Sequence, residues 1–231
     1  MLRILFWKIG FEWVQLKRLL APDIDRKILY FAFGANLARE VIEKRGIGIY
    51  DEFDYSLQSA KLRFSQSGFY AGHGYASADP SPNSEVYGKM YLILESDARR
   101  MDYFEGVPFL KVHHKVFKQA DGLTFYYYRA KKPLEDLKPT QEYLNYLVNS
   151  YRKMSIVPKQ YTDSLAKTAV LAECLPQNQT GDFIRDIRRW PKSMHSMLIR
   201  YEGYCLLTVK FLWNRSLFQS LIRKRTHNLV R

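Results

Sequence analysis

Hydrophobic positions between residues 28 and 170 follow two periodicities, one typical of strands and one typical of helices. The run at 28–33 is apolar and ends at a glycine, as a buried strand followed by a turn does. A loop rich in Gly, Ser, Asp and Pro is expected over 65–84. The patterns predict strands at 28–33, 60–65, 85–94, 112–118 and 123–129, and helices at 37–44, 95–104, 140–151 and 158–170. Without regular βαβ alternation, this order favours an α+β fold, a small mixed β-barrel with helices around it.

The first twenty residues have a different pattern. Lys8, Glu12 and Gln15 recur at helical spacing, and apolar residues fill most other positions. This predicts an amphipathic helix with a wide apolar face. Charges interrupt the apolar run and no small-residue cleavage site follows, so a signal peptide is not expected. Pro22 and Asp23 mark the end of the segment.

Charge separates the two ends of the chain from its middle. The formal net charge of the 231 residues is +13, of which residues 181–231 contribute +8 and residues 1–20 contribute +3. We therefore expect an N-terminal helix at 1–22, a central domain at 23–175 and a basic, helical C-terminal extension at 176–231. Within that extension, residues 203–222 are largely apolar and a basic cluster follows them.

Cysteine and histidine are too few, and wrongly spaced, for a structural metal site. The two cysteines are Cys174 and Cys205, and the five histidines show no HExxH or similar pattern. Two cysteines also cannot form a disulfide framework. We expect a chain that binds no metal and resides in the cytoplasm.

Three short motifs occur in a definite order in the central region. The first runs from Tyr30 to Leu37 (YFAFGANL), and the second is Glu85-Val86-Tyr87-Gly88. After a predicted strand and helix, the third is Tyr103-Phe104-Glu105-Gly106-Val107. Together they resemble the γ-glutamyl cyclotransferase-like family, which shows a YGSNL loop, a V-[WY]-G strand and an EGV turn. The resemblance spans about residues 28–170 and excludes both termini.

The resemblance implies a reaction and a set of site residues. Members of the family cyclise a γ-glutamyl amine, amide or peptide to 5-oxoproline and release the free amine, without a cofactor. Glu105 matches the catalytic acid/base, Tyr143 matches a substrate contact, and a looser alignment adds Tyr128. The substrate-binding loop corresponds to Tyr30, Phe31, Ala32, Phe33, Gly34 and Ala35.

This chemistry has two physical requirements. The substrate's α-amine is mostly protonated near neutral pH, so a carboxylate must remove a proton and later return one to the leaving nitrogen. The apolar neighbours of Glu105, among them Phe104 and Phe109, are expected to raise its pKa by burial. The oxyanion of the intermediate needs N–H donors, which a strand ending at Gly34 can expose.

Two departures from the family pattern concern the expected pocket. Ala35 stands where the family usually has serine, and Pro108-Phe109-Leu110-Lys111 lacks the tyrosine that many relatives place after EGV. Both bear on the identity of the substrate more than on the reaction class. Asp102, close to Glu105 in sequence, is expected to be solvated.

Two other classes of function stay open. The chain could be a non-catalytic γ-glutamyl-binding module, or a protein that docks on a membrane or a partner through its basic termini. The terminal segments either pack on the domain or bind the surface of an anionic membrane. Nucleic-acid binding is not expected, because no binding motif accompanies the basic charge.

Overall fold

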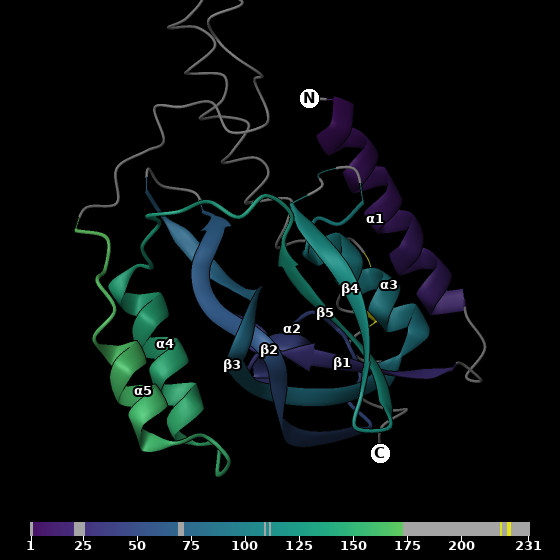
Figure 1. The fold of residues 1–231 in the computed structure, drawn as a ribbon. Coiled ribbons are helices and arrows are strands. Elements are labelled where there is room, and N and C mark those ends of the chain that lie inside the picture. Colours follow the sequence, from purple (N-terminus) through teal and green to yellow (C-terminus); the bar gives the residue numbers. More distant parts are fainter. Residues whose placement is uncertain are drawn as a thin grey trace, which may run out of the picture.

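The computed structural model describes residues 2–20, 26–68, 72–108, 110, 112–172, 218, 221 and 222. Two antiparallel helices flank one end of a curved sheet, and two other helices lie toward its opposite side (Figure 1). The predicted C-terminal extension at 176–231 falls almost wholly outside the described residues. The elements are α1 (Leu2–Leu20), β1 (Lys27–Ala32), α2 (Arg39–Lys44), β2 (Asp51–Ser67), β3 (Gly74–Leu94), α3 (Glu95–Phe104), β4 (His113–Ala120), β5 (Leu123–Ala130), α4 (Gln141–Arg152) and α5 (Lys159–Ala166).

One five-stranded mixed sheet in the order β2-β3-β1-β5-β4 organises the described residues. All its neighbouring strands are antiparallel except β1 and β5, which are parallel. The α+β class is thus confirmed, but the expected closed barrel is wrong, because the edge strands β2 and β4 do not pair in this part of the chain. Side chains link β2 to the hairpin instead: Tyr55 donates to Asp121 over 2.6 Å, and Lys118 donates to the Gln58 carbonyl over 2.6 Å.

The strands β2 and β3 are longer than the hydrophobic pattern predicts. β3 begins at Gly74, inside the expected loop, and runs through Pro80 and Pro82. Its ladder with β2 shifts register between Gln58 and Ala60, directly opposite this stretch. A proline, which lacks an N–H group, is tolerated in a strand where the ladder is irregular.

The strand β1 separates two apolar layers, because successive side chains of a strand point to opposite faces. Tyr30 and Ala32 lie in the cluster shared with α1 and α3, whereas Phe31 and Phe33 lie in the cluster inside the curved sheet. A third cluster joins α4 and α5 to the loop after β1, and Tyr151 is one of its buried members. The C-terminal end of β1 is therefore held from three sides.

Helix α1 packs against α3, as expected if the N-terminal segment packs on the domain. Trp7 and Phe11 are buried there, and the Trp7 indole donates to the carbonyl of Tyr103 over 2.9 Å. Among the described helices, none combines the length and the apolar character that a membrane crossing requires.

Candidate active site

Glu105 occupies the C-cap of α3, and Gly106 fixes it there. Gly106 has φ +62°, the left-handed conformation that ends many helices and favours glycine. Its N–H donates to the Tyr103 carbonyl over 3.1 Å, and the Val107 N–H donates to the Asp102 carbonyl over 2.9 Å. This pair of bonds is a Schellman motif. The Glu-Gly-Val sequence therefore ends the helix and holds the carboxylate just beyond it.

Three polar side chains surround the Glu105 carboxylate. Asn36 Nδ2 and Arg45 Nη1 both donate to Oε1, over 2.8 Å and 2.7 Å. The imidazole Nδ1 of His113 lies 3.6 Å from Oε2 and 2.7 Å from the backbone carbonyl of Glu105. Because a carbonyl can only accept, His113 carries its proton on Nδ1. The carboxylate is thus largely buried, with Oε1 accepting two hydrogen bonds and Oε2 lying near the imidazole.

The pKa of Glu105 moves in the direction opposite to the expected one. Burial raises it, but Arg45 and His113, together with the hydrogen bonds from Arg45 and Asn36, outweigh burial and hold the pKa below its ordinary value. The sequence-based expectation considered only the apolar neighbours along the chain. The cation comes instead from the end of α2, far away in sequence.

Arg45 is itself held in place by a buried arginine. Arg100 Nη2 donates to the Arg45 carbonyl over 2.5 Å, and Arg100 also binds the carbonyl of Gly46. Asp97 balances the Arg100 charge over 2.9 Å. The guanidinium of Arg45 in turn lies over the ring of Phe104, 5.1 Å from its centroid. This arrangement directs Arg45 towards Glu105.

The predicted substrate-binding loop presents backbone rather than side chains. Tyr30, Phe31, Ala32 and Phe33 are all buried in the apolar clusters. Beyond them, the N–H groups of Gly34, Ala35 and Asn36 donate to no other residue that the structure describes. Three successive N–H groups at a strand end can accommodate a carboxylate or an oxyanion.

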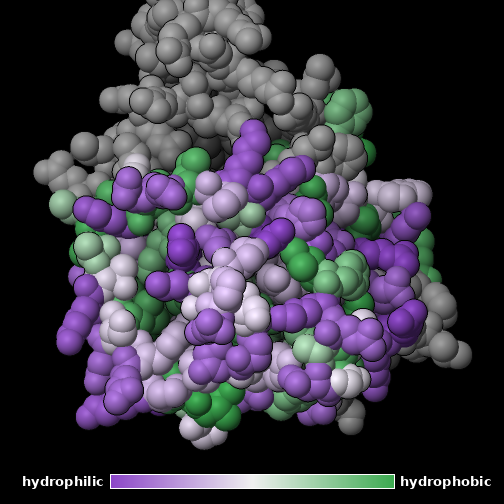
Figure 2. All heavy atoms as spheres, in the orientation of Figure 1, coloured by the Kyte–Doolittle hydropathy of each residue, from purple (hydrophilic) through white to green (hydrophobic). Residues whose placement is uncertain are grey.

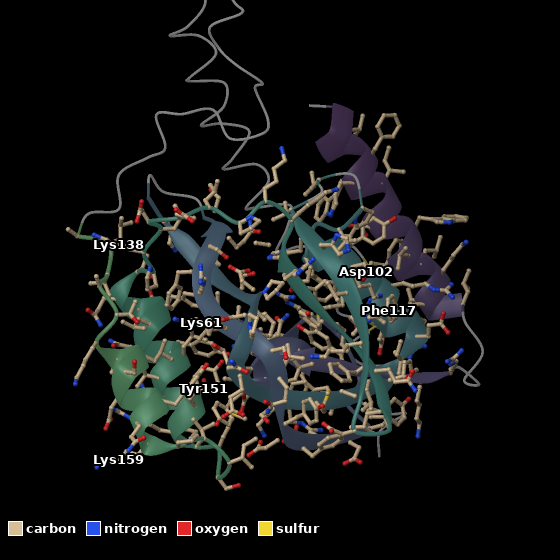
Figure 3. All side chains as sticks on the ribbon, in the orientation of Figure 1. Lys61, Asp102, Phe117, Lys138, Tyr151 and Lys159 are labelled. Atoms are coloured by element: carbon tan, nitrogen blue, oxygen red, sulfur yellow. The ribbon has the colours of Figure 1, made fainter. Side chains whose placement is uncertain are left out.

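Tyrosine hydroxyls hold the carbonyl side of the same loop. Tyr151 donates to the Phe33 carbonyl over 2.7 Å, and Tyr146 donates to the Ala35 carbonyl over 2.9 Å. Figure 3 labels Tyr151 on the side of α4 that faces the sheet. With its carbonyls engaged from α4, the loop keeps its N–H groups available for a ligand.

Tyr143, the predicted contact from α4, lies directly against this loop. A Cβ placed on Gly34 would lie 3.3 Å from the Tyr143 hydroxyl, and the Ala76 N–H approaches that hydroxyl at 3.4 Å. Gly34 has no left-handed φ, so the constraint at this position is space, because an added Cβ would require the Tyr143 hydroxyl to shift. Burial raises the pKa of Tyr143, so its hydroxyl stays protonated near neutral pH.

Asn36 is a site residue that the sequence-based prediction left out, although it lies within the first motif. Its Nδ2 bridges the Glu105 carboxylate and the Tyr30 hydroxyl, which lies 2.7 Å away. Its Oδ1 is buried and has no partner among the described residues. The carboxylate fixes the amide orientation, because two acceptors would otherwise face each other. Asn36 therefore offers a free acceptor beside Glu105.

Tyr128 does not offer a free hydroxyl. It donates to Asp102 Oδ1 over 2.6 Å, and Lys115 Nζ lies 3.0 Å from the same oxygen. Asp102 is mostly buried between α3 and the β4–β5 hairpin, so the expectation that it is solvated is wrong (Figure 3). Burial raises the pKa of Asp102 in spite of Lys115. No group of three or more potential metal ligands occurs among the described residues.

Comparison with known proteins finds likeness at the level of the fold. No family model matches the sequence, and no curated protein matches it significantly. A solved structure described as a gamma-glutamyl cyclotransferase matches at TM-score 0.53 and 21% identity, over 76% of this chain and 99% of its own. An uncharacterized protein from Homo sapiens matches at TM-score 0.51 and 23% identity, over 75% of this chain and 98% of its own.

Proposed function

We propose that this chain, which has the fold of gamma-glutamyl cyclotransferase, cyclises a γ-glutamyl amine, amide or peptide to 5-oxoproline. The observation that carries the proposal is the buried Glu105 carboxylate. Asn36 binds it from the same loop whose N–H groups are free. A proton acceptor and a set of oxyanion donors thus belong to one short stretch of structure. In this proposal the reaction is cytoplasmic and needs no cofactor.

The proposed reaction is an intramolecular acyl transfer with Glu105 as acid and base. Glu105 takes a proton from the α-ammonium group, and the freed nitrogen attacks the γ-carbonyl carbon to form the ring. The bond to the leaving nitrogen then breaks, and that nitrogen takes the proton back from Glu105, while the ring nitrogen releases its second surplus proton to solvent. One carboxylate suffices because nucleophile and electrophile belong to the same molecule.

The free N–H groups of Gly34, Ala35 and Asn36 have a role in the same scheme. They support stabilisation of the oxyanion that develops on the γ-carbonyl oxygen, since they are fixed in place before the substrate arrives. The free Oδ1 of Asn36 suits the substrate's ammonium group, because it is an acceptor beside the base. Tyr143 lies directly against Gly34 of this loop.

Arg45 needs a role in any catalytic scheme, because its charge weakens Glu105 as a base. We propose that the α-carboxylate of the substrate binds Arg45. Only Nη1 of Arg45 donates to the Glu105 carboxylate, and a guanidinium has further N–H donors. A carboxylate on Arg45 would neutralise its field, raise the pKa of Glu105 and strengthen it as a base.

The pairing of Arg45 with Glu105 also favours one alternative. If Arg45 never leaves Glu105, the pocket holds an ionised carboxylate of low basicity. Such a pocket would bind a γ-glutamyl group through ammonium, carboxylate and backbone contacts without turning it over. The chain would then be a non-catalytic binding module.

The two alternatives separate when binding and turnover are measured on the same variant. Glu105→Gln keeps the shape of the side chain and removes proton transfer, so kcat should fall by about 10²–10⁴-fold. Substrate affinity by calorimetry should change less, because the loop backbone remains. Glu95→Gln is the matched control, since Glu95 is exposed at the other end of α3 and pairs with Arg99. A Glu105→Gln protein that keeps more than about a tenth of wild-type kcat would show that Glu105 is not the acid and base.

A further inference from the structure

The outward face of α1 is apolar, whereas part of its inward face is polar. The large apolar side chains of α1 that are more than half exposed are Leu5, Phe6, Ile9, Trp13 and Leu20. Residues 5, 9, 13 and 20 share one side of a helix at its period, and Phe6 adjoins them. On the opposite side, Gln15 and Arg18 are buried. A surface helix normally has the reverse distribution.

Buried charges fix this orientation of α1. Arg18 Nε pairs with Asp97 Oδ1 over 3.2 Å, and Gln15 accepts a hydrogen bond from Arg100. Asp97 and Arg100 belong to α3 and are fully buried. Turning the apolar face of α1 inward would remove Arg18 from Asp97 and Gln15 from Arg100, which is costly for buried polar groups. The exposed apolar face is therefore built into the packing of α1 on α3.

The surface around α1 can be followed in the figures. Figure 1 places α1 on the outside of the domain, with α3 between it and the sheet. In the same orientation, Figure 2 shows hydrophilic side chains over much of the central face and hydrophobic ones towards the margin where α1 lies. We call the exposed side chains of Leu5, Phe6, Ile9, Trp13 and Leu20 the α1 face.

We propose that the α1 face binds the surface of an anionic membrane. A second copy of the chain fits less well, because stable interfaces use about 20–30 residues a side and the α1 face supplies five large side chains on one helix. A helix lying in the membrane interface needs only its apolar face to insert. Tryptophan suits that depth, and Lys17 lies over the ring of Trp13, 5.3 Å from its centroid.

Charge complementarity supports the same occupant. The chain carries a formal net charge of +13, of which residues 181–231 carry +8, and α1 presents the exposed Lys17 beside Trp13, whereas its Arg18 is buried against Asp97. Basic residues near an anionic leaflet add attraction that falls off within a Debye length. Apolar insertion and electrostatic attraction together are the two components of peripheral membrane binding.

The test is co-sedimentation of the full chain with vesicles. Phosphatidylcholine vesicles containing phosphatidylserine should bind the wild type at low salt, and pure phosphatidylcholine vesicles should bind it less. High salt should weaken binding by screening. The double variant Leu5→Ser/Ile9→Ser should lower the vesicle partition coefficient at least about tenfold, because it removes two apolar insertions.

The matched control is Leu134→Ser/Ile156→Ser, which changes the same residue types at exposed positions away from α1. It should bind vesicles as the wild type does. Single Trp13→Ser replaces the double variant if that protein does not fold.

The proposal is overturned if the wild type does not bind anionic vesicles at low salt, or if the variant and its control bind equally. A dimer by light scattering that Leu5→Ser/Ile9→Ser dissociates, without vesicle binding, would assign the face to a second copy.

Discussion

Glu105 and Asp102 lie one turn apart at the end of α3, and each has a cation within hydrogen-bonding distance. Their pKa values nevertheless move in opposite directions, down for Glu105 and up for Asp102. Burial raises the pKa of both carboxyl groups. At Glu105 the interactions with Arg45, His113 and Asn36 lower the pKa by more than burial raises it. At Asp102 the interactions with Lys115 and Tyr128 lower it by less. At Asp102 the neighbouring Glu105 charge also raises the pKa, whereas at Glu105 both Arg45 and His113 lower it.

The partners of the two carboxylates also come from different regions. Asn36 and Arg45 belong to the loop and helix that follow β1, so hydrogen bonds tie Glu105 to the predicted substrate-binding loop. Lys115 and Tyr128 belong to the β4–β5 hairpin, so Asp102 ties α3 to the sheet. We propose proton transfer for the Glu105 region and structural support for the Asp102 region. Changes in the first should affect turnover, and changes in the second should affect stability.

After Glu105 itself, the largest effect on turnover is expected at Gly34. Gly34→Val adds branched carbon where a Cβ would already lie 3.3 Å from the Tyr143 hydroxyl. Displacing reacting groups by about 1 Å can cost about 10²-fold, so kcat/KM should fall by that order. Gly34→Ala should lose less, because only the tyrosine hydroxyl must shift. Unchanged kcat/KM in a folded Gly34→Val protein would remove this loop from the site.

Arg45→Gln should have the next largest effect, mainly on KM. If Arg45 receives the substrate carboxylate, KM should rise about tenfold or more, because a charged hydrogen bond is lost. The acid limb of the kcat/KM profile should also move to higher pH, because the pKa of Glu105 is no longer lowered by the Arg45 charge. Arg39→Gln, on the exposed side of α2, is the control and should change neither. A raised kcat with unchanged KM would mean that Arg45 only inhibits.

Asp102→Asn should change kcat by no more than a few-fold. The amide keeps the shape and can still accept from Tyr128, but it no longer balances Lys115. Steady-state assays of 5-oxoproline release would measure this. A loss comparable to that of Glu105→Gln would reverse the two assignments and make Asp102 the proton-transferring group.

The smallest effect is a difference in the pH dependence of stability. The pKa of Glu105 is lower in the folded protein than its ordinary value of 4.5. Its carboxylate therefore stabilises the fold above pH 4.5, and this contribution is lost as the pH falls through the folded pKa. The folded pKa of Asp102 is raised, so ionisation costs stability as pH rises from 3.8 through the folded value. Urea unfolding of the wild type, Glu105→Gln and Asp102→Asn across this range should give differences of opposite slope. Equal slopes would show that the two environments do not differ.

Much of this arrangement could be predicted from local sequence. The strand at 28–33, the glycine turn and the helix that ends at Glu105-Gly106-Val107 are encoded by residues next to one another. The Schellman motif needs only a glycine at one position, which is why the placement of Glu105 was predictable. Gly34 was expected where a strand ends and exposes N–H groups, and the structure adds that the Tyr143 hydroxyl leaves little space for a side chain there.

The electrostatics of the site could not be predicted in the same way. Arg45 and Asn36 are 60 and 69 residues from Glu105, and their contacts depend on how α2 docks on α3. That docking rests on buried Arg100, which no apolar periodicity reveals. The long β2–β3 ladder was hidden for a similar reason, because Gly, Ser and Pro in 65–84 obscure a strand that long-range pairing stabilises.

The most direct test is whether the wild-type protein converts the γ-glutamyl compounds that it binds. A panel of γ-glutamyl amines, amides and peptides is incubated with the protein, and 5-oxoproline and the released amine are both quantified while calorimetry measures binding. The account predicts that at least one bound compound yields the two products in equal amounts. Binding of several compounds with release of neither product would contradict it and identify the chain as a γ-glutamyl-binding module.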